Sequence, residues 1–478
     1  MERTNLPVPR TRCRLGVARA DITPPPDAYH RNWGAALHDR AAGIHRPLTA
    51  SVVALAPPEA DGPLSVLVAL DLGWMRQEEM AHLLEALRRG TGLAGSDLIV
   101  TFSHTHAAIN LDRERAGEPG GEHIEPYLEA LPQRLLAAFE EARAGLTPAE
   151  LTFGHGRCDL AMNRDCRDED RGIFVCGPNP GAPADDLVTV GRAAALDDGR
   201  LLCTLVNYAC HATTLAWENQ LISPDYVGAM REVVEQATSA PCVFLQGAAG
   251  ELGPRYGFVG ETEVADANGR QLGYAALSAL TALPPPGREL QYRGPVVSGA
   301  TLGVWRYGEA TDAEIDTVRT RELVLDLALR DMPTAAELEE RLSLWARRED
   351  EARAAGDEVG VRDARAQVER ARRAMRRTQG LPDSGRVSYE VGLWQLGQAA
   401  IALVGGEPYS LLQRRVRDRL TDTPVMVVEL CNYAYSYILP EDEYGKGLYQ
   451  DDCSILAPGS LEQIADRIGD ALEEWDLH

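Results

Sequence analysis

The sequence lacks any uninterrupted apolar run of 18 residues, which excludes a transmembrane helix from the prediction. Its first residues, MERTNLPVPRTRCRLG, also lack the apolar stretch of a secretory signal. Basic side chains are few, 48 against 72 acidic ones, and the formal net charge of −24 disfavours binding to nucleic acid or to an anionic membrane surface. These absences predict a cytoplasmic protein with no nucleic-acid partner and no stable membrane association.

The cysteines lack C-x-x-C spacing, which excludes a zinc ribbon and a thioredoxin-like motif. Several of the nine lie in apolar runs such as TLVNYAC and VVELC, where cysteine usually serves as a small buried hydrophobe. We therefore expect free structural thiols in a reducing compartment. The remaining composition, 45% apolar and 25% charged over 478 residues, is that of an ordinary globular protein with a large core.

Short β-rich runs alternate with helical stretches between residues 13 and 305, which predicts an α/β fold with a mixed sheet at its core. Four runs predict buried strands: residues 64–72, 98–103, 201–209 and 242–247. EEMAHLLEALRRG and YLEALPQRLLAAFEEARAG have helical spacing and end in glycine. Residues 154–186 are rich in Gly, Pro, Asp and Arg without periodicity, and predict a long ordered loop.

Residues 312–378 differ in kind, because 16 of them are acidic and 14 are basic. Their apolar residues suggest helical spacing, and Gly356 and Gly360 interrupt the segment, which predicts an inserted long helical hairpin. We expect residues 1–305 and 380–478 to form one α/β domain together. Three roles are open for the hairpin: a solvated element, a lid, or an interface of a homo-oligomer. Strand patterns return at residues 393–407 and 424–433.

Potential metal ligands follow four of the strand-like runs, LIVTFS, LLCTLVNYAC, IALVGG and VMVVEL. The residues after these runs are, in order, His104 and His106, then His211, then Glu407, and finally Tyr433, Tyr435 and Tyr437. The carboxyl ends of strands in α/β sheets open into the ligand crevice, so four such endings can converge on one site. Two imidazoles and a carboxylate are a frequent ligand set for catalytic zinc, which leaves one position open for water.

Each histidine also has a simpler interpretation as a hydrogen-bonded structural residue. In the SHTH segment, positions i and i+2 of an extended chain point the same way, so His104 and His106 can face one pocket. Both then ligate a metal, or one ligates while the other carries protons. The segment GAAGELG (residues 247–253) lacks both the G-x-G-x-x-G spacing and a P-loop lysine, which argues against a nucleotide site.

Taken together, several motifs resemble the neutral/alkaline (non-lysosomal) ceramidase family, of which this chain would be a divergent bacterial member. The segments that carry the resemblance are SHTHAAIN (103–110), NRD (163–165), NYACHATTL (207–215), ISPDYVGAMRE (222–232), FLQGAAGELGPR (244–255), GGEPYS (405–410) and NYAYSYILPEDEYGKGLY (432–449). Their order and approximate spacing agree with the family. The resemblance implies a ceramidase-like catalytic domain.

The resemblance also implies one Zn²⁺ per chain and a role for each site residue. The implied metal ligands are His104, His211, Glu407 and Tyr437, with Tyr435 as the alternative to Tyr437. His106 would carry protons, Arg164 would bind the substrate oxyanion, and Tyr449 would assist it. A family tyrosine lies twelve positions after the ligand tyrosine, and Tyr449 has this offset from Tyr437, which favours Tyr437.

The expected reaction is hydrolysis of a C–N amide bond by metal-activated water. A serine nucleophile is excluded at one debated family position, because Gly253 occupies it here. With no signal sequence and only 6% aromatic residues, a small soluble N-acyl amide is a better substrate candidate than a membrane lipid. The alternatives are an esterase or lactonase on the same site, a non-catalytic binding or scaffold protein, and iron or manganese in place of zinc.

Overall fold

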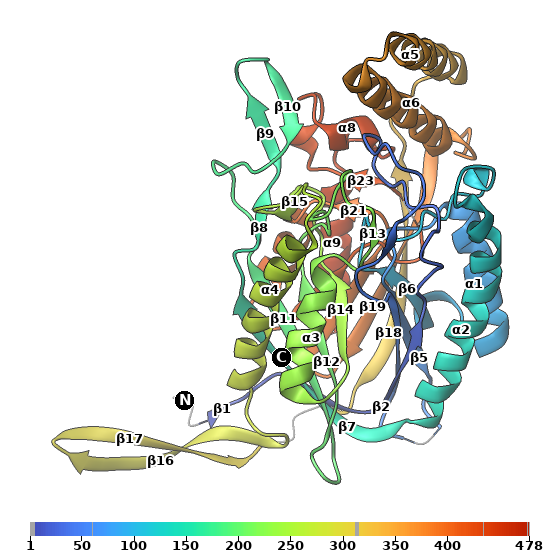
Figure 1. The fold of residues 1–478 in the computed structure, drawn as a ribbon. Coiled ribbons are helices and arrows are strands. Elements are labelled where there is room, and N and C mark those ends of the chain that lie inside the picture. Colours follow the sequence, from blue (N-terminus) through green and yellow to red (C-terminus); the bar gives the residue numbers. More distant parts are fainter. Residues whose placement is uncertain (1–4, 60, 311–314, 434, 476, 478) are drawn as a thin grey trace.

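An eight-stranded mixed sheet forms the centre of the molecule, in the order β14-β12-β11-β7-β2-β4-β5-β6 (Figure 1). The computed structural model describes residues 5–59, 61–310, 315–433, 435–475 and 477. The strands of this sheet are Arg10–Asp21 (β2), Thr49–Ala56 (β4), Ser65–Leu70 (β5), Leu98–Phe102 (β6), Thr147–Arg157 (β7), Leu187–Ala195 (β11), Leu201–Tyr208 (β12) and Cys242–Gln246 (β14). Only the outermost pairs, β12–β14 and β5–β6, are parallel.

The two parallel pairs exist because a helix crosses between their strands, as parallel strands require. Helix α1 connects β5 to β6, and α3 connects β12 to β14. Together with α2 and α4 they cover one face of the sheet (Figure 1). These helices span Gln77–Thr91 (α1), Ile124–Ala144 (α2), Tyr226–Thr238 (α3) and Thr262–Ala282 (α4). The predicted α/β class, the four predicted strands and the two predicted helices are thereby confirmed.

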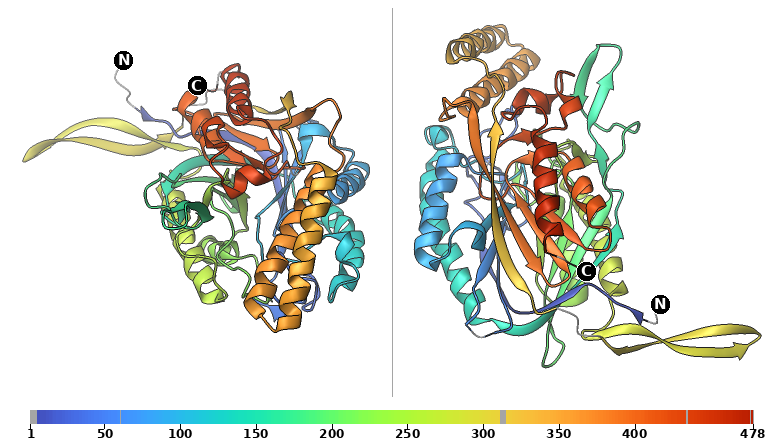
Figure 2. Two further views of the ribbon diagram at one scale, coloured as in Figure 1. Left: turned by 90° about the horizontal axis from the view of Figure 1, so that it is seen from above. Right: turned by 180° about the vertical axis from the view of Figure 1, so that it is seen from behind.

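A second sheet, in the order β18-β19-β20-β22, packs on the other face of the first. Its strands are Val318–Ala328 (β18), Arg386–Leu396 (β19), Ala399–Val404 (β20) and Val425–Val428 (β22). Helices α7 (Leu411–Arg419) and α9 (Ser460–Glu473) cover its outer face, as the rear view in Figure 2 shows. Strand alternation makes these layers: Val52 packs toward the helices, whereas Val53 packs toward the second sheet.

The predicted helical hairpin is shorter than residues 312–378. Residues 312–314 lie outside the described residues, and β18 occupies the part that follows. Leu323, Leu325 and Leu327 are buried at every second position, which is the period of a strand and not of a helix. The two helices are α5 (Ala335–Ala355) and α6 (Glu358–Thr378), here named the arm, and Gly356 ends α5 in the left-handed conformation. Seen from above, they lie side by side (Figure 2).

The prediction of one long loop over residues 154–186 is wrong. Strand β7 continues into it, β8 pairs with β15, and β9 pairs with β10 as an exposed hairpin. The short strands of the molecule are Asn5–Leu6 (β1), Gly43–Ile44 (β3), Ala161–Asn163 (β8), Asp165–Asp168 (β9), Ile173–Cys176 (β10), Leu221–Ile222 (β13), Leu252–Pro254 (β15), Glu407–Pro408 (β21) and Tyr437–Ile438 (β23). The short helix α8 spans Tyr449–Cys453.

A second hairpin, β16 (Arg288–Ser298) and β17 (Ala300–Glu309), projects from the opposite end of the molecule and pairs with β1 (Figure 1). All nine cysteines are free thiols, and most are buried, as the apolar runs around them predicted. Among the described residues, no helix combines the length and the apolar character needed to cross a lipid bilayer.

Candidate metal centre

Residues 429–432 draw the two edges of the first sheet together. The backbone amide of Glu429 donates to the carbonyl of Gln246 on β14 at 2.9 Å. On the other side, Asn432 exchanges two hydrogen bonds of 2.9 Å with the backbone of Val100 on β6. The sheet therefore curls until β6 and β14 are neighbours. As a result, the loops after β6 and β12 meet, although these strands lie far apart in the order of the sheet.

The remaining two predicted ligands come from the short parallel pair β21–β23, which places Glu407 directly opposite Tyr437. Gly406 makes this approach possible. Its φ is +74°, and a Cβ there would lie 2.6 Å from the carbonyl oxygen of Ser436. Only glycine fits such a close and left-handed position. The Gly-Gly sequence before Glu407 is therefore part of how the site is built.

The imidazoles of His104 and His211 are fixed by backbone carbonyls. The Nδ1 atom of His104 lies 2.8 Å from the carbonyl oxygen of Gly73, and Nδ1 of His211 lies 2.7 Å from that of Ala249. A carbonyl can only accept, so each Nδ1 carries the hydrogen, and in a neutral ring Nε2 is left with a lone pair. Backbone carbonyls orient many metal-binding histidines in this way.

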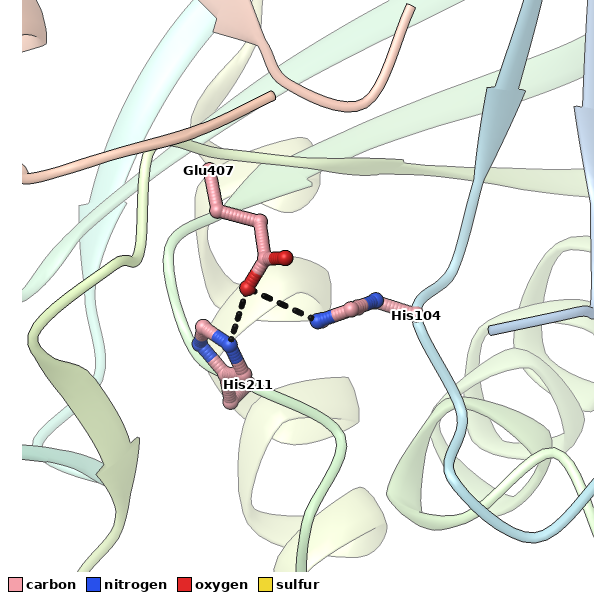
Figure 3. Close-up of side chains that lie close together, drawn as sticks. All are labelled: His104, His211 and Glu407. Carbon is pink, nitrogen blue, oxygen red and sulfur yellow. Dashed lines mark hydrogen bonds and ion pairs between the residues drawn. The ribbon is translucent and has the colours of Figure 1, made fainter. Parts of the chain in front are cut away.

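Both Nε2 atoms face one oxygen of Glu407, as Figure 3 shows. The Oε2 atom lies 3.4 Å from Nε2 of His104 and 3.1 Å from Nε2 of His211. Burial, followed by the charge of Arg164, lowers the pKa of His211 to about 3, so this ring is neutral. Lone pairs of nitrogen and oxygen then point at one another in a buried place, which a shared cation would stabilise. The ligand atoms of His104, His211 and Glu407 all lie within 4.8 Å of one another.

The donor set fits a divalent metal ion, since two imidazoles, a carboxylate and a tyrosine oxygen are accepted ligands of zinc, iron and manganese. The hydroxyl of Tyr437 lies 3.3 Å from Nε2 of His211, at the same focus. Tyr435, the alternative ligand, points elsewhere, because its hydroxyl donates to the carbonyl of Ser388. The geometry therefore brings together His104, His211, Glu407 and Tyr437 and leaves Tyr435 out.

His106 lies beside the first ligand, with its Nε2 atom 3.4 Å from Nε2 of His104. The indole rings of Trp33 and Trp74 pack against it, with ring centroids 5.1 and 5.5 Å away. Burial, and then the charge on His104, lowers the pKa of His106 well below its ordinary value. A neutral ring in this position can accept a proton from a reacting group.

Arg164 lies behind the ligands. Its guanidinium donates to the hydroxyl of Tyr437 at 3.1 Å and to the carbonyl of Gly250 at 2.8 Å, and it lies 3.1 Å from Nε2 of His211. Arg164 does not line the main cavity described below. Through these contacts Arg164 fixes the positions of the Tyr437 and His211 side chains. The predicted contact of Arg164 with a substrate oxyanion stays a prediction.

Tyr449, the first residue of α8, faces Tyr437 with the ring centroids 5.9 Å apart. Cys453, one turn further along the helix, and burial raise the pKa of Tyr449, so its hydroxyl keeps its proton and can donate a hydrogen bond. Gly253, at the debated serine position, lies near Arg164 and Thr213 and offers no nucleophile.

A cavity of about 890 Å³ opens in front of these groups. Five of the predicted site residues line it: His104, His106, Glu407, Tyr437 and Tyr449. The sequence did not reveal that the arm forms another part of the wall through Arg373, Arg376 and Arg377. Nor did it reveal Trp74. Nothing in the local pattern distinguishes these arginines from the others of the arm, and only the fold brings them to the site.

A second cluster, Asp27, Glu122 and His123, also has metal-ligand spacing, but it lies largely exposed at the surface. Arg40 already pairs with both of its carboxylates, at 2.9 Å from Asp27 and 2.5 Å from Glu122. This cluster therefore does not need a metal ion to balance its charge.

Comparison with solved structures shows that ceramidases have the same fold. The crystal structure of neutral ceramidase from Pseudomonas aeruginosa superposes with a TM-score of 0.65 over 98% of this chain and 75% of that one, at 18% sequence identity. A structure of a ceramidase complexed with C2 gives 0.65 over 98% and 76%, at 17% identity. No protein-family model and no curated protein matches at the level of sequence. The chain thus has the neutral ceramidase fold, as its motifs predicted.

Proposed function

We propose that this protein is a metal-dependent hydrolase that cleaves the C–N bond of an N-acyl amide, with one Zn²⁺ held by His104, His211, Glu407 and Tyr437. The observation that carries the proposal is the pair of carbonyl-fixed imidazoles whose Nε2 atoms face one carboxylate oxygen beside a large cavity. Zinc in such a set polarises a carbonyl and lowers the pKa of water toward neutrality. The shared fold with ceramidases, which are amide hydrolases, supports the same conclusion.

The side chains around the ligands have distinct parts in this proposal. His106 takes the proton of the attacking water at its imidazole and delivers it to the leaving amine. Tyr449 donates its hydroxyl hydrogen to the oxygen of the tetrahedral intermediate. Arg164 keeps Tyr437 in place through the 3.1 Å hydrogen bond to its hydroxyl. Trp33 and Trp74 pack around His106 and hold its ring in place.

We further propose that the substrate is a small soluble amide and not a membrane lipid, and that the enzyme acts in the cytoplasm. The arm supports the first part, because its helix α6 forms a wall of the cavity and would restrict access for a two-chain lipid. In this proposal the arm is a wall of the cavity, and its predicted roles as a lid or as a homo-oligomer interface stay predictions. A strict preference for long-chain ceramide over simple N-acyl amides would contradict the substrate proposal.

An esterase or lactonase on the same site is the first alternative to the proposal, and assays with matched amide and ester substrates separate the two. Purified protein is dialysed against a chelator, reloaded with zinc, iron or manganese, and tested on butanoyl 4-nitroanilide and on 4-nitrophenyl butanoate. These substrates share the acyl group and differ in the amide or ester bond. We expect amide hydrolysis that chelation abolishes and zinc restores. Ester hydrolysis without amide hydrolysis would favour the esterase or lactonase.

The variant His211→Ala tests the site itself, with His82→Ala, an exposed histidine of α1, as the matched control. Elemental analysis should find about one zinc per chain in the wild type and in the control, and little in His211→Ala. Absence of metal and of activity from all three proteins, even after addition of zinc, would favour the non-catalytic binding protein.

A further inference from the structure

Helix α6 is docked firmly on the mouth of the cavity, so the positions of its side chains are defined. Its own residues Ala364, Val368 and Ala371 are buried against the rest of the protein. Its buried Glu369 pairs with Arg31 at 3.2 Å and with Arg115 at 2.5 Å. At the C-terminal end of the helix, salt bridges join Arg376 to Asp112 and Glu114. The arm is therefore a fixed wall and not a loosely attached hairpin.

The arginines around the cavity fall into two groups. Arg76, Arg115 and Arg376 each pair with carboxylates, among them Asp112 and Glu369. Arg373 and Arg377 do not: within the described part of the chain, neither has a carboxylate within 4.0 Å. Arg373 donates to the carbonyl of Asn32 at 2.6 Å, and its guanidinium lies 5.9 Å from the ring of Trp74.

Arg377 is the less satisfied of the two. Its Nε atom is buried and has no hydrogen-bond partner among the described residues. The carboxylates in the cavity wall are Glu78, Asp112, Glu369, Glu390 and Glu407, and none of them makes an ion pair with Arg373 or Arg377. The charge of Arg373 does reach Glu369 and helps to lower its pKa. Both side chains are partly buried, and a partly desolvated cation without a carboxylate partner is a candidate for binding an anionic ligand.

Arg373 and Arg377, which both lack a carboxylate partner, lie on one face of α6 because they are four residues apart. Both line the same cavity as His106 and Tyr449. Guanidinium groups bind carboxylates and phosphates with parallel hydrogen bonds, which lysine and neutral side chains cannot reproduce. The inner end of the cavity therefore suits an amide, and the wall beside it suits an anion.

We propose that Arg373 and Arg377 bind an anionic group of the substrate, so the substrate class is an N-acyl amide that carries a negative charge near the scissile bond. This inference rests on the proposed function. It runs against the expectation from the net charge of −24, which by itself would repel anions. The local charges within the cavity decide binding, since charges on the outer surface are screened within about 8 Å at physiological salt.

The test compares substrates that differ only in charge. N-octanoylglycine and its neutral amide, N-octanoylglycinamide, place the group on the amine part. N-glutaryl octylamine and N-pentanoyl octylamine place it on the acyl part. We expect the wild type to prefer the anionic member of at least one pair by kcat/KM. In Arg373→Gln and in Arg377→Gln the acid-to-neutral ratio should fall about ten- to a hundredfold, mainly through KM.

The matched control is Arg353→Gln on α5, an exposed arginine of the same arm that pairs with Glu349. It should keep the wild-type ratio. Equal kcat/KM for both members of both pairs, or the same ratio in Arg377→Gln and Arg353→Gln, would overturn the inference while the proposed hydrolase stands. Thermal melting of each variant shows whether it is folded.

If no amide is hydrolysed, the proposed function fails, and calorimetry still decides the inference. Titration of N-octanoylglycine into wild-type protein should then show binding that Arg377→Gln weakens about tenfold or more and Arg353→Gln does not. Equal affinity of all three proteins, or no binding to any, would refute an anion site at these arginines.

Discussion

The candidate metal centre and the arm face the same cavity, yet they are built in opposite ways. The metal centre takes its residues from the ends of core strands, and backbone carbonyls fix His104 and His211. The arm lies between β18 and β19 in the chain, and ion pairs between side chains, such as Glu369 with Arg115, hold it to the fold. This difference suggests that the core determines the chemistry and the arm determines which molecule reaches it.

The largest effect should come from removing a ligand of the metal centre. Glu407→Gln removes the negative charge that both Nε2 atoms face and keeps the shape of the side chain. We expect loss of bound metal and a fall in kcat of roughly a thousandfold or more, because metal activation supplies several kcal/mol of transition-state stabilisation. Elemental analysis and steady-state kinetics measure both, and the loss should be alike for anionic and neutral amides.

A smaller effect is expected from Tyr449→Phe, which deletes one hydrogen-bond donor to the oxyanion. Kinetics at saturating substrate should show a fall in kcat of about a hundredfold with metal content unchanged. Tyr435→Phe is the matched control, because Tyr435 also lines the cavity but donates to the carbonyl of Ser388. If both variants lose the same activity, Tyr449 has no special place in the reaction.

The attachment of the arm can be broken without touching the metal centre. Burial alone would raise the pKa of Glu369, but the charges of Arg115 and Arg31 outweigh it and hold the pKa below its ordinary value. Glu369→Gln should therefore destabilise the protein at pH 7 by about 3 kcal/mol, as expected when one partner of a buried ion pair is lost. Hydrogen exchange should show faster opening of α6 than of the core strands.

The pH dependence of this difference has a defined sign. Folding lowers the pKa of Glu369. The contribution of its carboxylate to the free energy of unfolding is therefore complete above the unfolded pKa of about 4.3, and it is lost as the pH falls through the lower pKa of the folded state. The free energies of unfolding of wild type and Glu369→Gln should thus differ by a constant amount above about pH 5 and converge below pH 4. A constant difference down to acid pH would mean that the charge of Glu369 does not hold the arm.

The residues of the candidate metal centre could be predicted from the sequence, because polar residues that directly follow buried strands are visible in the local pattern. His104, His211 and Glu407 were found in this way, and the choice of Tyr437 over Tyr435 came from the family spacing. The sequence could not show how residues 429–432 curl the first sheet, because hydrogen bonds between distant strands leave no local signal.

The arm was the part that the sequence predicted least well. Part of the segment predicted as the hairpin, residues 312–378, is β18, and the alternation of Leu323, Leu325 and Leu327 was available as a signal for a strand. The cavity arginines had no such signal. Arg373 and Arg377 are two of 14 basic residues between positions 312 and 378, and what distinguishes them is that they line the cavity without a carboxylate partner. Pairing depends on tertiary packing and cannot be read from a charged segment.

The most direct test of the metal centre is a diffraction experiment on the protein purified without added metal, with data collected on both sides of the zinc absorption edge. We predict one anomalous peak, about 2.0–2.3 Å from Nε2 of His104, Nε2 of His211 and the oxygen atoms of Glu407 and Tyr437. A peak only at the surface cluster of Asp27, Glu122 and His123, or no peak from a fully active protein, would contradict a zinc-dependent reaction at this site.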